Sequence, residues 1–175
     1  MEIRKARPHE FAAVRGFYHS VIDAMEGAEY GPGWKKGIYP ADEELRRALE
    51  SGTLFLGEED SKACAAMVVN HEGNESYADA PWPTAAEPGE FAVIHMLCVH
   101  PACGGRGLGG QLVDHALDLA RKTGQKCVRL DVLKGNLPAN RLYEGRGFRY
   151  IGTLPMFYED TGWTDYELYE YSLEG

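Results

Sequence analysis

The chain has 175 residues, a length that fits one domain, and 44% of them are hydrophobic against 26% charged. This composition excludes a disordered or fibrous chain. With 18 Lys and Arg against 27 Asp and Glu, the formal net charge is −9, which argues against broad binding to nucleic acids or anionic membranes.

In the N-terminal half, apolar residues recur every three or four positions over 8–25, which predicts an amphipathic helix. A second helix fits 40–51, with acidic residues in its first turn and Gly52 just after its end. Two paired strands are expected at 53–56 and 63–70.

Two loops are also expected in this half. The segment 27–37 holds four glycines and a proline, and the polar segment 71–90 holds three prolines. The second predicts a long surface loop, and loops of that length are often functional.

The C-terminal half alternates strands and helices. In chain order we expect a strand at 91–99, a helix at 108–122, a strand at 126–132, a helix at 137–146, and closing strands at 148–153 and 167–173. A strand, a helix and a strand in succession predict a parallel pair with a right-handed crossover. The predicted fold class is therefore α/β, with a central sheet flanked by helices.

The four cysteines, Cys64, Cys98, Cys103 and Cys127, have neither C-x-x-C spacing nor nearby histidine pairs. We therefore expect no metal site and no disulfide framework, and interpret the cysteines as small buried hydrophobic residues. The sequence shows no signal peptide and no apolar run of about 18 residues, so a cytoplasmic location without membrane contact is expected.

Five of the 21 glycines fall in 104–110, between a predicted strand and a predicted helix. Glycines bring backbone N–H groups close to a ligand, and a helix N-terminus adds partial positive charge, so the turn suits a phosphate or pyrophosphate. Arg106 could lie beside that anion. The alternative is a tight turn without a ligand.

The turn also fits a dinucleotide fingerprint. Gly105, Gly107 and Gly110 match G-x-G-x-x-G, and Asp131 follows about 20 residues later. Against this, residues 100–104 separate the strand from the glycines, and too little chain follows for a doubly wound sheet.

A second pattern resembles the Gcn5-related N-acetyltransferase family. The sequence Val99-His-Pro101 followed by Gly105-Arg-Gly107-Leu-Gly109 resembles its acetyl-CoA signature, R/Q-x-x-G-x-G/A. Gly104 stands where the signature has Arg or Gln, which removes one polar contact near the pyrophosphate.

The family's second motif follows at the family's separation. It is N-x-x-A-x-x-L-Y-x-x-x-G-F, matched by Asn136, Ala139, Leu142, Tyr143, Gly147 and Phe148. The resemblance covers about 91–153. It implies an acetyltransferase fold with a mixed sheet, one domain over 1–175, and acetyl-CoA as acyl donor.

The resemblance also implies which residues hold the cofactor. Backbone groups of Leu97, Cys98 and Val99 would bind the pantetheine arm. The turn of Gly104, Gly105, Arg106, Gly107, Leu108, Gly109 and Gly110 would hold the pyrophosphate. Asn136, Ala139 and Tyr143 would complete the site.

Tyr143 is the candidate general acid for the departing thiolate, because a tyrosine stays protonated at neutral pH. The alternative is a core tyrosine beside Leu142 and Phe148.

His95 is a candidate base, since strand alternation puts it on the same face as Leu97. The stretch from His95 to His100 resembles that of arylalkylamine acetyltransferases, although Val93 replaces their further histidine. A hydrogen-bonded structural histidine is the alternative.

Asp131 is the rival base, at the position where ribosomal-protein alanine acetyltransferases carry a glutamate. It could equally be a solvated or capping group, and Glu90 could act through water. No cysteine is assigned as nucleophile, because the family transfers acetyl directly.

Aromatic and acidic residues that could receive an amine occur outside the motifs, and ordinary packing is the alternative. They are Tyr30, Trp34, Tyr39, Trp82, Phe157, Tyr158, Glu159, Asp160, Trp163, Asp165 and Tyr166.

The predicted reaction is N-acetylation of a primary amine of a small molecule or protein in a ternary complex. The alternatives are a dinucleotide-binding oxidoreductase domain and a non-catalytic acyl-CoA-binding regulator. A homodimer is compatible with the fold.

Overall fold

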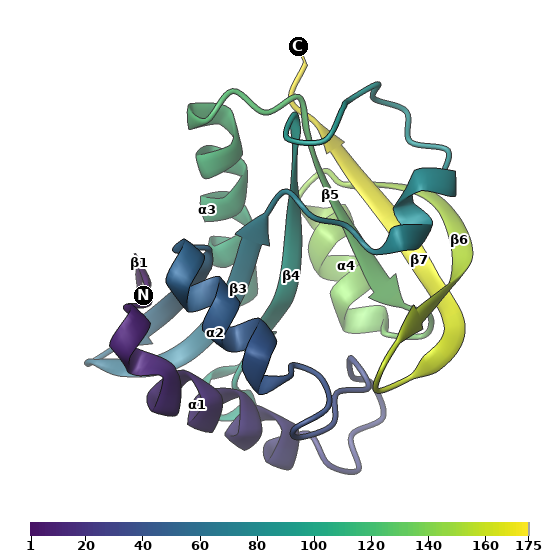
Figure 1. The fold of residues 1–175 in the computed structure, drawn as a ribbon. Coiled ribbons are helices and arrows are strands. Elements are labelled where there is room, and N and C mark those ends of the chain that lie inside the picture. The colour runs from purple at the N-terminus through teal and green to yellow at the C-terminus, as the bar shows by residue number, and fades with distance from the viewer. Residues whose placement is uncertain (175) are drawn as a thin grey trace.

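Seven strands form one sheet in the order β1-β2-β3-β4-β5-β7-β6 in the computed structural model, which describes residues 1–174 (Figure 1). The strands are β1 (Glu2–Lys5), β2 (Leu54–Glu59), β3 (Lys62–Asn70), β4 (Phe91–Val99), β5 (Cys127–Leu133), β6 (Arg149–Tyr158) and β7 (Gly162–Ser172). The helices are α1 (Phe11–Ala24), α2 (Asp42–Ser51), α3 (Leu108–Lys122) and α4 (Leu137–Gly145), and three short 3-10 turns are η1 (Pro8–Glu10), η2 (Glu75–Asp79) and η3 (Pro101–Cys103).

The sheet is mixed. Within residues 1–174, β4 and β5 are the one parallel pair, and α3 connects them. The other neighbouring strands are antiparallel. The predicted fold class is confirmed, and this topology is not the doubly wound parallel sheet that the dinucleotide alternative requires.

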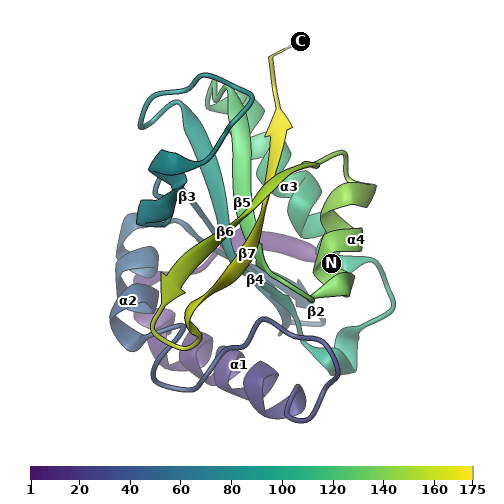
Figure 2. The same ribbon diagram turned by 90° about the vertical axis from the view of Figure 1, so that its right-hand side faces the viewer.

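Helices cover both faces of the sheet because successive residues of a strand point to opposite sides. Along β3, Met67 and Val69 pack in a core with α3, whereas Ala66 and Val68 pack in a second core with α1 and α2. Figure 2 shows α1 and α2 on one side of the sheet and α3 and α4 on the other.

The helix α2 illustrates how local sequence sets an element's start. Its first turn holds Asp42, Glu43 and Glu44, whose charges suit a helix N-terminus. The Glu44 carboxylate accepts a hydrogen bond from the Ala41 N–H at 2.9 Å, which satisfies a backbone donor before the helix begins.

The four predicted helices and the predicted strands that correspond to β2, β3, β4 and β5 agree with the structure to within three residues at each end. The closing strands are longer than predicted and form a hairpin, β6–β7. The short edge strand β1 was not predicted, because its Glu2, Arg4 and Lys5 lack the apolar alternation of a buried strand.

The prediction of a surface loop over 71–90 is wrong in part. The segment contains η2, and its Tyr77 and Thr84 are buried. Arg129 donates a hydrogen bond to the Thr84 carbonyl at 2.7 Å, and the Thr84 N–H donates to Glu170 at 3.0 Å. A buried ion pair between Arg129 and Glu170 therefore fastens this segment to the sheet.

Candidate active site

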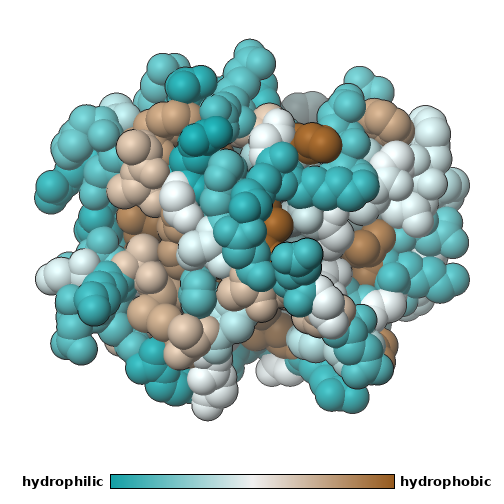
Figure 3. Space-filling model, turned by 90° about the horizontal axis from the view of Figure 1, so that it is seen from below, coloured by the Kyte–Doolittle hydropathy of each residue, from teal (hydrophilic) through white to brown (hydrophobic). Residues whose placement is uncertain are grey.

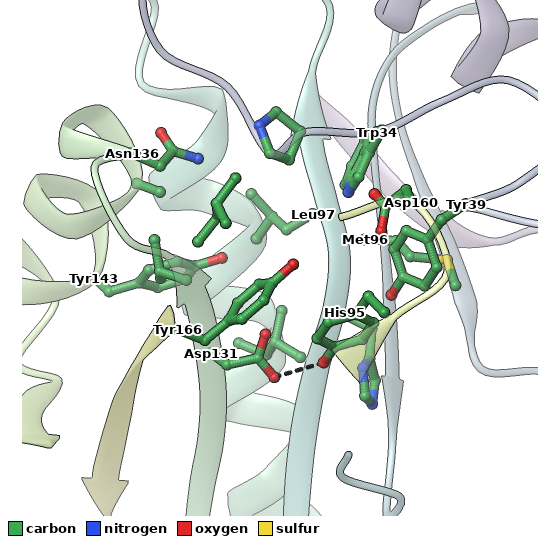
Figure 4. Close-up of a pocket in the computed structure, with 16 residues that line it drawn as sticks. Trp34, Tyr39, His95, Met96, Leu97, Asp131, Asn136, Tyr143, Asp160 and Tyr166 are labelled. Carbon is green, nitrogen blue, oxygen red and sulfur yellow. Dashed lines mark hydrogen bonds between the residues drawn. The ribbon is translucent and has the colours of Figure 1, made fainter. Parts of the chain in front are cut away.

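A cavity of about 100 Å³ lies where β4 and β5 separate (Figure 4). The two strands pair at Phe91–Cys127, Ala92–Val128 and Val93–Arg129, and no further pairing joins them. Residues from β4, β5, α4, β6, β7 and the loop before α2 line the space. They include Trp34, Tyr39, His95, Met96, Leu97, Asp131, Asn136, Ala139, Tyr143, Tyr158, Asp160 and Tyr166.

A bulge in β4 accompanies this separation. The pairing of β3 with β4 shifts between Ala66 and Val68, and Met96 has a positive φ of 52°. Such a conformation is uncommon for residues other than glycine. The fully buried Tyr18 donates its hydroxyl to the Met96 carbonyl at 2.9 Å, so α1 holds the bulge in place.

The backbone N–H and C=O groups of the predicted pantetheine-binding residues, Leu97, Cys98 and Val99, do not all face the same neighbouring strand. The His100 N–H donates to the Cys64 carbonyl of β3 at 2.8 Å. By the alternation of an antiparallel ladder, the Cys98 backbone groups also point to β3, and those of Val99 point toward the side of β5. Val99 is therefore better placed than Cys98 to offer backbone groups to a ligand, and the Leu97 side chain lines the cavity.

The two candidate bases, His95 and Asp131, line the same cavity from β4 and β5. His95 Nε2 lies 2.8 Å from the Asn70 Oδ1 atom, which orients the ring. Burial lowers the pKa of His95, and the negative charge of Asp131 opposes that effect.

Asp131 is held by two phenols. Its Oδ2 accepts hydrogen bonds from Tyr77 at 2.7 Å and from Tyr158 at 2.8 Å. Burial raises the pKa of Asp131, and these two hydrogen bonds oppose the shift. Among the described residues Oδ1 has no hydrogen-bond partner, so one carboxylate oxygen remains free for a ligand.

Tyr143 comes from α4. Its ring packs against Phe148 and Tyr169, with ring centroids 5.6 and 6.4 Å away. The ring is therefore part of the core, as the alternative interpretation of Tyr143 predicts. It also lines the cavity, and its hydroxyl makes no hydrogen bond with residues 1–174. Burial raises the pKa of Tyr143 and keeps the phenol protonated.

The glycine-rich turn connects β4, through η3, to α3. Gly105 and Gly107 have φ of 77° and 70°, which residues with a Cβ rarely adopt. No side chain caps the N-terminus of α3, so its first N–H groups remain available for an anion. At Gly110 the Arg146 guanidinium lies against the helix where a Cβ would stand.

The cations near this turn are arranged differently from the prediction. Arg106 forms an ion pair with Glu59, and its Nε donates to the Cys103 carbonyl at 3.3 Å. Arg146 lies against the first turn of α3, and its Nε atom is 3.5 Å from the Oδ1 atom of Asp114. The place of Arg146 beside this turn was not predicted, because no local pattern distinguishes this residue, which directly follows α4.

Of the predicted acceptor residues, Trp34, Tyr39, Tyr158, Asp160 and Tyr166 line the cavity. The other six do not. Trp82 packs on Tyr77, and Phe157 pairs with Trp163 on the exposed face of the β6–β7 hairpin. Glu159 and Asp165 are exposed. Tyr30 lines a neighbouring groove under α1. Glu90 pairs with Lys126 before β4 begins and does not line the cavity.

A wider groove of about 550 Å³ meets the cavity on the side of α2. Tyr39, His95, Met96 and Tyr158 line both spaces. Glu44, Glu72 and Arg47 supply charge to the groove, whereas no lysine or arginine of residues 1–174 lines the cavity itself. Seen from the end toward which β4 points, apolar side chains are exposed between hydrophilic ones (Figure 3).

Two further classes of feature are absent from the described residues. No group of three or more His, Cys, Asp or Glu there could hold a metal ion. No helix in that part of the chain is long and apolar enough to cross a membrane.

Comparison with known proteins adds to this geometry. A family model described as Acetyltransferase (GNAT) family matches residues 19–148. The chain is 28% identical to the streptothricin acetyltransferase of Streptomyces lavendulae over 91% of this chain and 87% of that protein.

Solved structures are similar in fold at lower identity. An acetyltransferase of the GNAT family from Streptococcus agalactiae is 18% identical, with a TM-score of 0.80 over 99% of this chain and 96% of that chain. The yncA protein of Salmonella typhimurium, solved with its cofactor acetyl-CoA, is 20% identical, with a TM-score of 0.70 over 100% of this chain and 95% of that chain.

Proposed function

The chain belongs to the acetyltransferase (GNAT) family and is an acetyl-CoA-dependent acetyltransferase, and we propose that it acetylates a primary amine by direct attack in a ternary complex. The observation that carries this proposal is that His95, Asp131 and Tyr143 line one cavity at the point where β4 and β5 separate. A proton acceptor and a proton donor are thus available to one reacting centre.

Acetyl-CoA would extend from the glycine-rich turn into the cavity. The free N–H groups at the start of α3 would bind the pyrophosphate, with the turn of 104–110 around it. The pantetheine arm would follow the open side of β4 at Leu97 and Val99, and would pass Asn136 and Ala139 of the α4 region. When bound, acetyl-CoA supplies the activated thioester.

The chain's own groups would then move the protons. His95 or Asp131 first accepts a proton from the ammonium group, which frees the nitrogen lone pair. The neutral nitrogen then attacks the thioester carbonyl carbon, the carbon–sulfur bond breaks, and the second proton that the nitrogen loses replaces the one that Tyr143 gives up. Tyr143 donates its hydroxyl proton to the leaving thiolate, which is supported by the burial that keeps it protonated.

The acceptor would enter through the groove beside α2. Asp131 has a free carboxylate oxygen, Asp160 is a second acid in the cavity, and Trp34, Tyr39 and Tyr166 provide aromatic faces. Carboxylates and aromatic rings without a competing lysine or arginine favour an ammonium group. We therefore propose a cationic primary amine as acceptor, of a small molecule or a peptide.

An amine panel tests the proposal, with released CoA thiol as the readout and cationic, neutral and acidic amines compared. We expect turnover with cationic primary amines, and calorimetric binding of acetyl-CoA but not of NAD. Binding of acetyl-CoA without turnover on any amine would indicate a non-catalytic acyl-CoA-binding regulator. A preference for acidic amino acids would contradict the proposed acceptor class.

A further inference from the structure

Two thiols that are 39 positions apart in sequence meet beside the glycine-rich turn. The Sγ atoms of Cys64 in β3 and Cys103 in η3 lie 2.7 Å from each other. We propose that Cys64 and Cys103 form an oxidative modification site, in which a peroxide joins them in a disulfide that ties the start of the glycine-rich turn to β3. This site lies outside the acetyl-transfer cavity, and its formation does not depend on the proposed acceptor.

The backbone already holds the two residues together. The His100 N–H donates to the Cys64 carbonyl at 2.8 Å, and the Cys103 N–H donates to the His100 carbonyl at 2.8 Å. A disulfide bond is about 2.05 Å long, so the sulfur atoms need to approach by only roughly 0.7 Å. A small shift of η3 toward β3, together with side-chain adjustment, would supply that movement.

An oxidant can reach the pair from solvent. Both cysteines line a surface depression of about 440 Å³, together with Glu59, His100 and Arg106. Cys64 is buried and Cys103 is half-buried, so peroxide meets Cys103 first. Arg106 lines the depression and forms an ion pair with Glu59, so its side chain does not block the approach to Cys103 through a contact with either thiol.

The reaction balances in two steps. The Cys103 thiol attacks hydrogen peroxide, forms a sulfenic acid and releases one water. The Cys64 sulfur then displaces the second water from the sulfenic acid and forms the S–S bond. The two thiols lose two electrons and two protons, and the peroxide is reduced to two water molecules.

The modification should reach the cofactor site because Gly104 directly follows Cys103. The Gly104 N–H donates to the Pro101 carbonyl at 3.1 Å, so η3 and the start of the turn move as a unit. Drawing Cys103 toward β3 displaces the turn whose N–H groups face the pyrophosphate. We expect the Kd of acetyl-CoA to rise at least threefold on oxidation.

The test treats the reduced protein with one equivalent of hydrogen peroxide and maps peptides by mass spectrometry without reduction. We expect a Cys64–Cys103 peptide pair, a Tm higher by about 5 °C because the crosslink closes a long loop, and reversal of both by dithiothreitol. Calorimetry with acetyl-CoA gives the Kd in each state. None of these measurements requires turnover, so they test the modification site even if the protein acetylates no amine in the panel.

Variants make the test specific. Cys103→Ser and, as an independent second variant, Cys64→Ala should lose the crosslink, the Tm rise and the change in Kd. Cys127→Ala removes one buried, distant thiol and should keep all three. Sulfinic acid at Cys103 with no crosslink, or a crosslink between two chains, would overturn the modification site. A mapped crosslink with an unchanged Kd would overturn its coupling to the cofactor.

Discussion

Tyr143 is the residue whose proposed role depends on a single atom. Its ring is fixed by Phe148 and Tyr169, and its hydroxyl is free in the cavity. We expect Tyr143→Phe to slow single-turnover acetyl transfer by about 100-fold or more, because general acid catalysis contributes roughly that much. Rapid-quench kinetics measures this rate.

Tyr169→Phe is the matched control, because the Tyr169 hydroxyl binds Asn140 and Glu144 and does not line the cavity. It should leave the single-turnover rate within a few-fold of the native value. A native rate in Tyr143→Phe would remove Tyr143 from the chemistry.

The pH dependence of kcat/KM distinguishes the two candidate bases. Burial lowers the pKa of His95 from its ordinary value of 6.5, so if His95 is the base, the fall of activity at acidic pH should have its midpoint below 6.5. His95→Ala should then lose this acidic limb along with most of its activity. The control is His115→Ala, which removes a histidine of α3 whose pKa is also lowered by burial but which lies outside the cavity. An acidic limb that persists in His95→Ala would assign the base to Asp131.

Asp131 should lower stability at neutral pH. Because burial raises its pKa above 3.8, the folded chain binds this proton more tightly than the unfolded chain, and stability falls as pH rises from about 4 through the folded pKa. Asp131→Asn removes the buried charge while its amide oxygen can still accept from Tyr77 and Tyr158. We expect a Tm above that of the native protein at pH 7 and equal Tm values below about pH 4.

Calorimetry between pH 3.5 and 8 measures this difference, with the exposed Asp165→Asn as control. A Tm for Asp131→Asn that is lower than native at pH 7 would show that the carboxylate stabilises the fold through its two phenols.

At the scale of elements, the turn before α3 combines left-handed glycine backbone with the proposed pyrophosphate site. Gly107 and Gly124 flank this helix with φ of 70° and 71°, and open space surrounds the Cβ position of each. Alanine at either site should cost about 1–2 kcal/mol of folding free energy for the left-handed conformation. Only Gly107→Ala should also raise the Kd of acetyl-CoA, because the anion-facing N–H groups begin there. Urea unfolding and calorimetry check both quantities, and equal Kd values in the two variants would contradict the assignment of the turn.

Local patterns predicted the elements around the cavity and several residues that line it, but not the long-range contacts that shape it. The helix at 108–122 and the strand at 91–99 were predictable because apolar periodicity and glycine placement are local. The bulge at Met96 was not, since a buried hydroxyl from Tyr18, 78 positions away, stabilises it. Tyr77 was likewise missed: it lies in a polar segment, and only the fold brings it to Asp131, 54 positions away.

At the scale of the whole molecule, a buried ion pair connects the 71–90 segment to the sheet and so to the active site. Arg129 and Glu170 are 5% and 3% exposed, and the Arg129 guanidinium also lies over the rings of Trp82 and Phe91, 4.6 and 4.4 Å from their centroids. Tyr77 belongs to the same segment, and its hydroxyl donates a hydrogen bond to the Asp131 carboxylate. Disruption of the ion pair should therefore affect both stability and the site.

Glu170→Gln leaves the Arg129 cation buried without its counter-charge, and we expect a loss of about 3–5 kcal/mol of unfolding free energy in urea titrations. Hydrogen exchange should accelerate over 75–86, where the backbone of Thr84 loses part of its anchoring. Glu58→Gln is the control: Glu58 pairs with Arg4 in a partly exposed network that Glu10 also supports, and its loss should cost less than about 1 kcal/mol. A cost for Glu170→Gln no larger than that of the control would mean that packing of Trp82 and Phe91, and not the ion pair, holds the segment on the sheet.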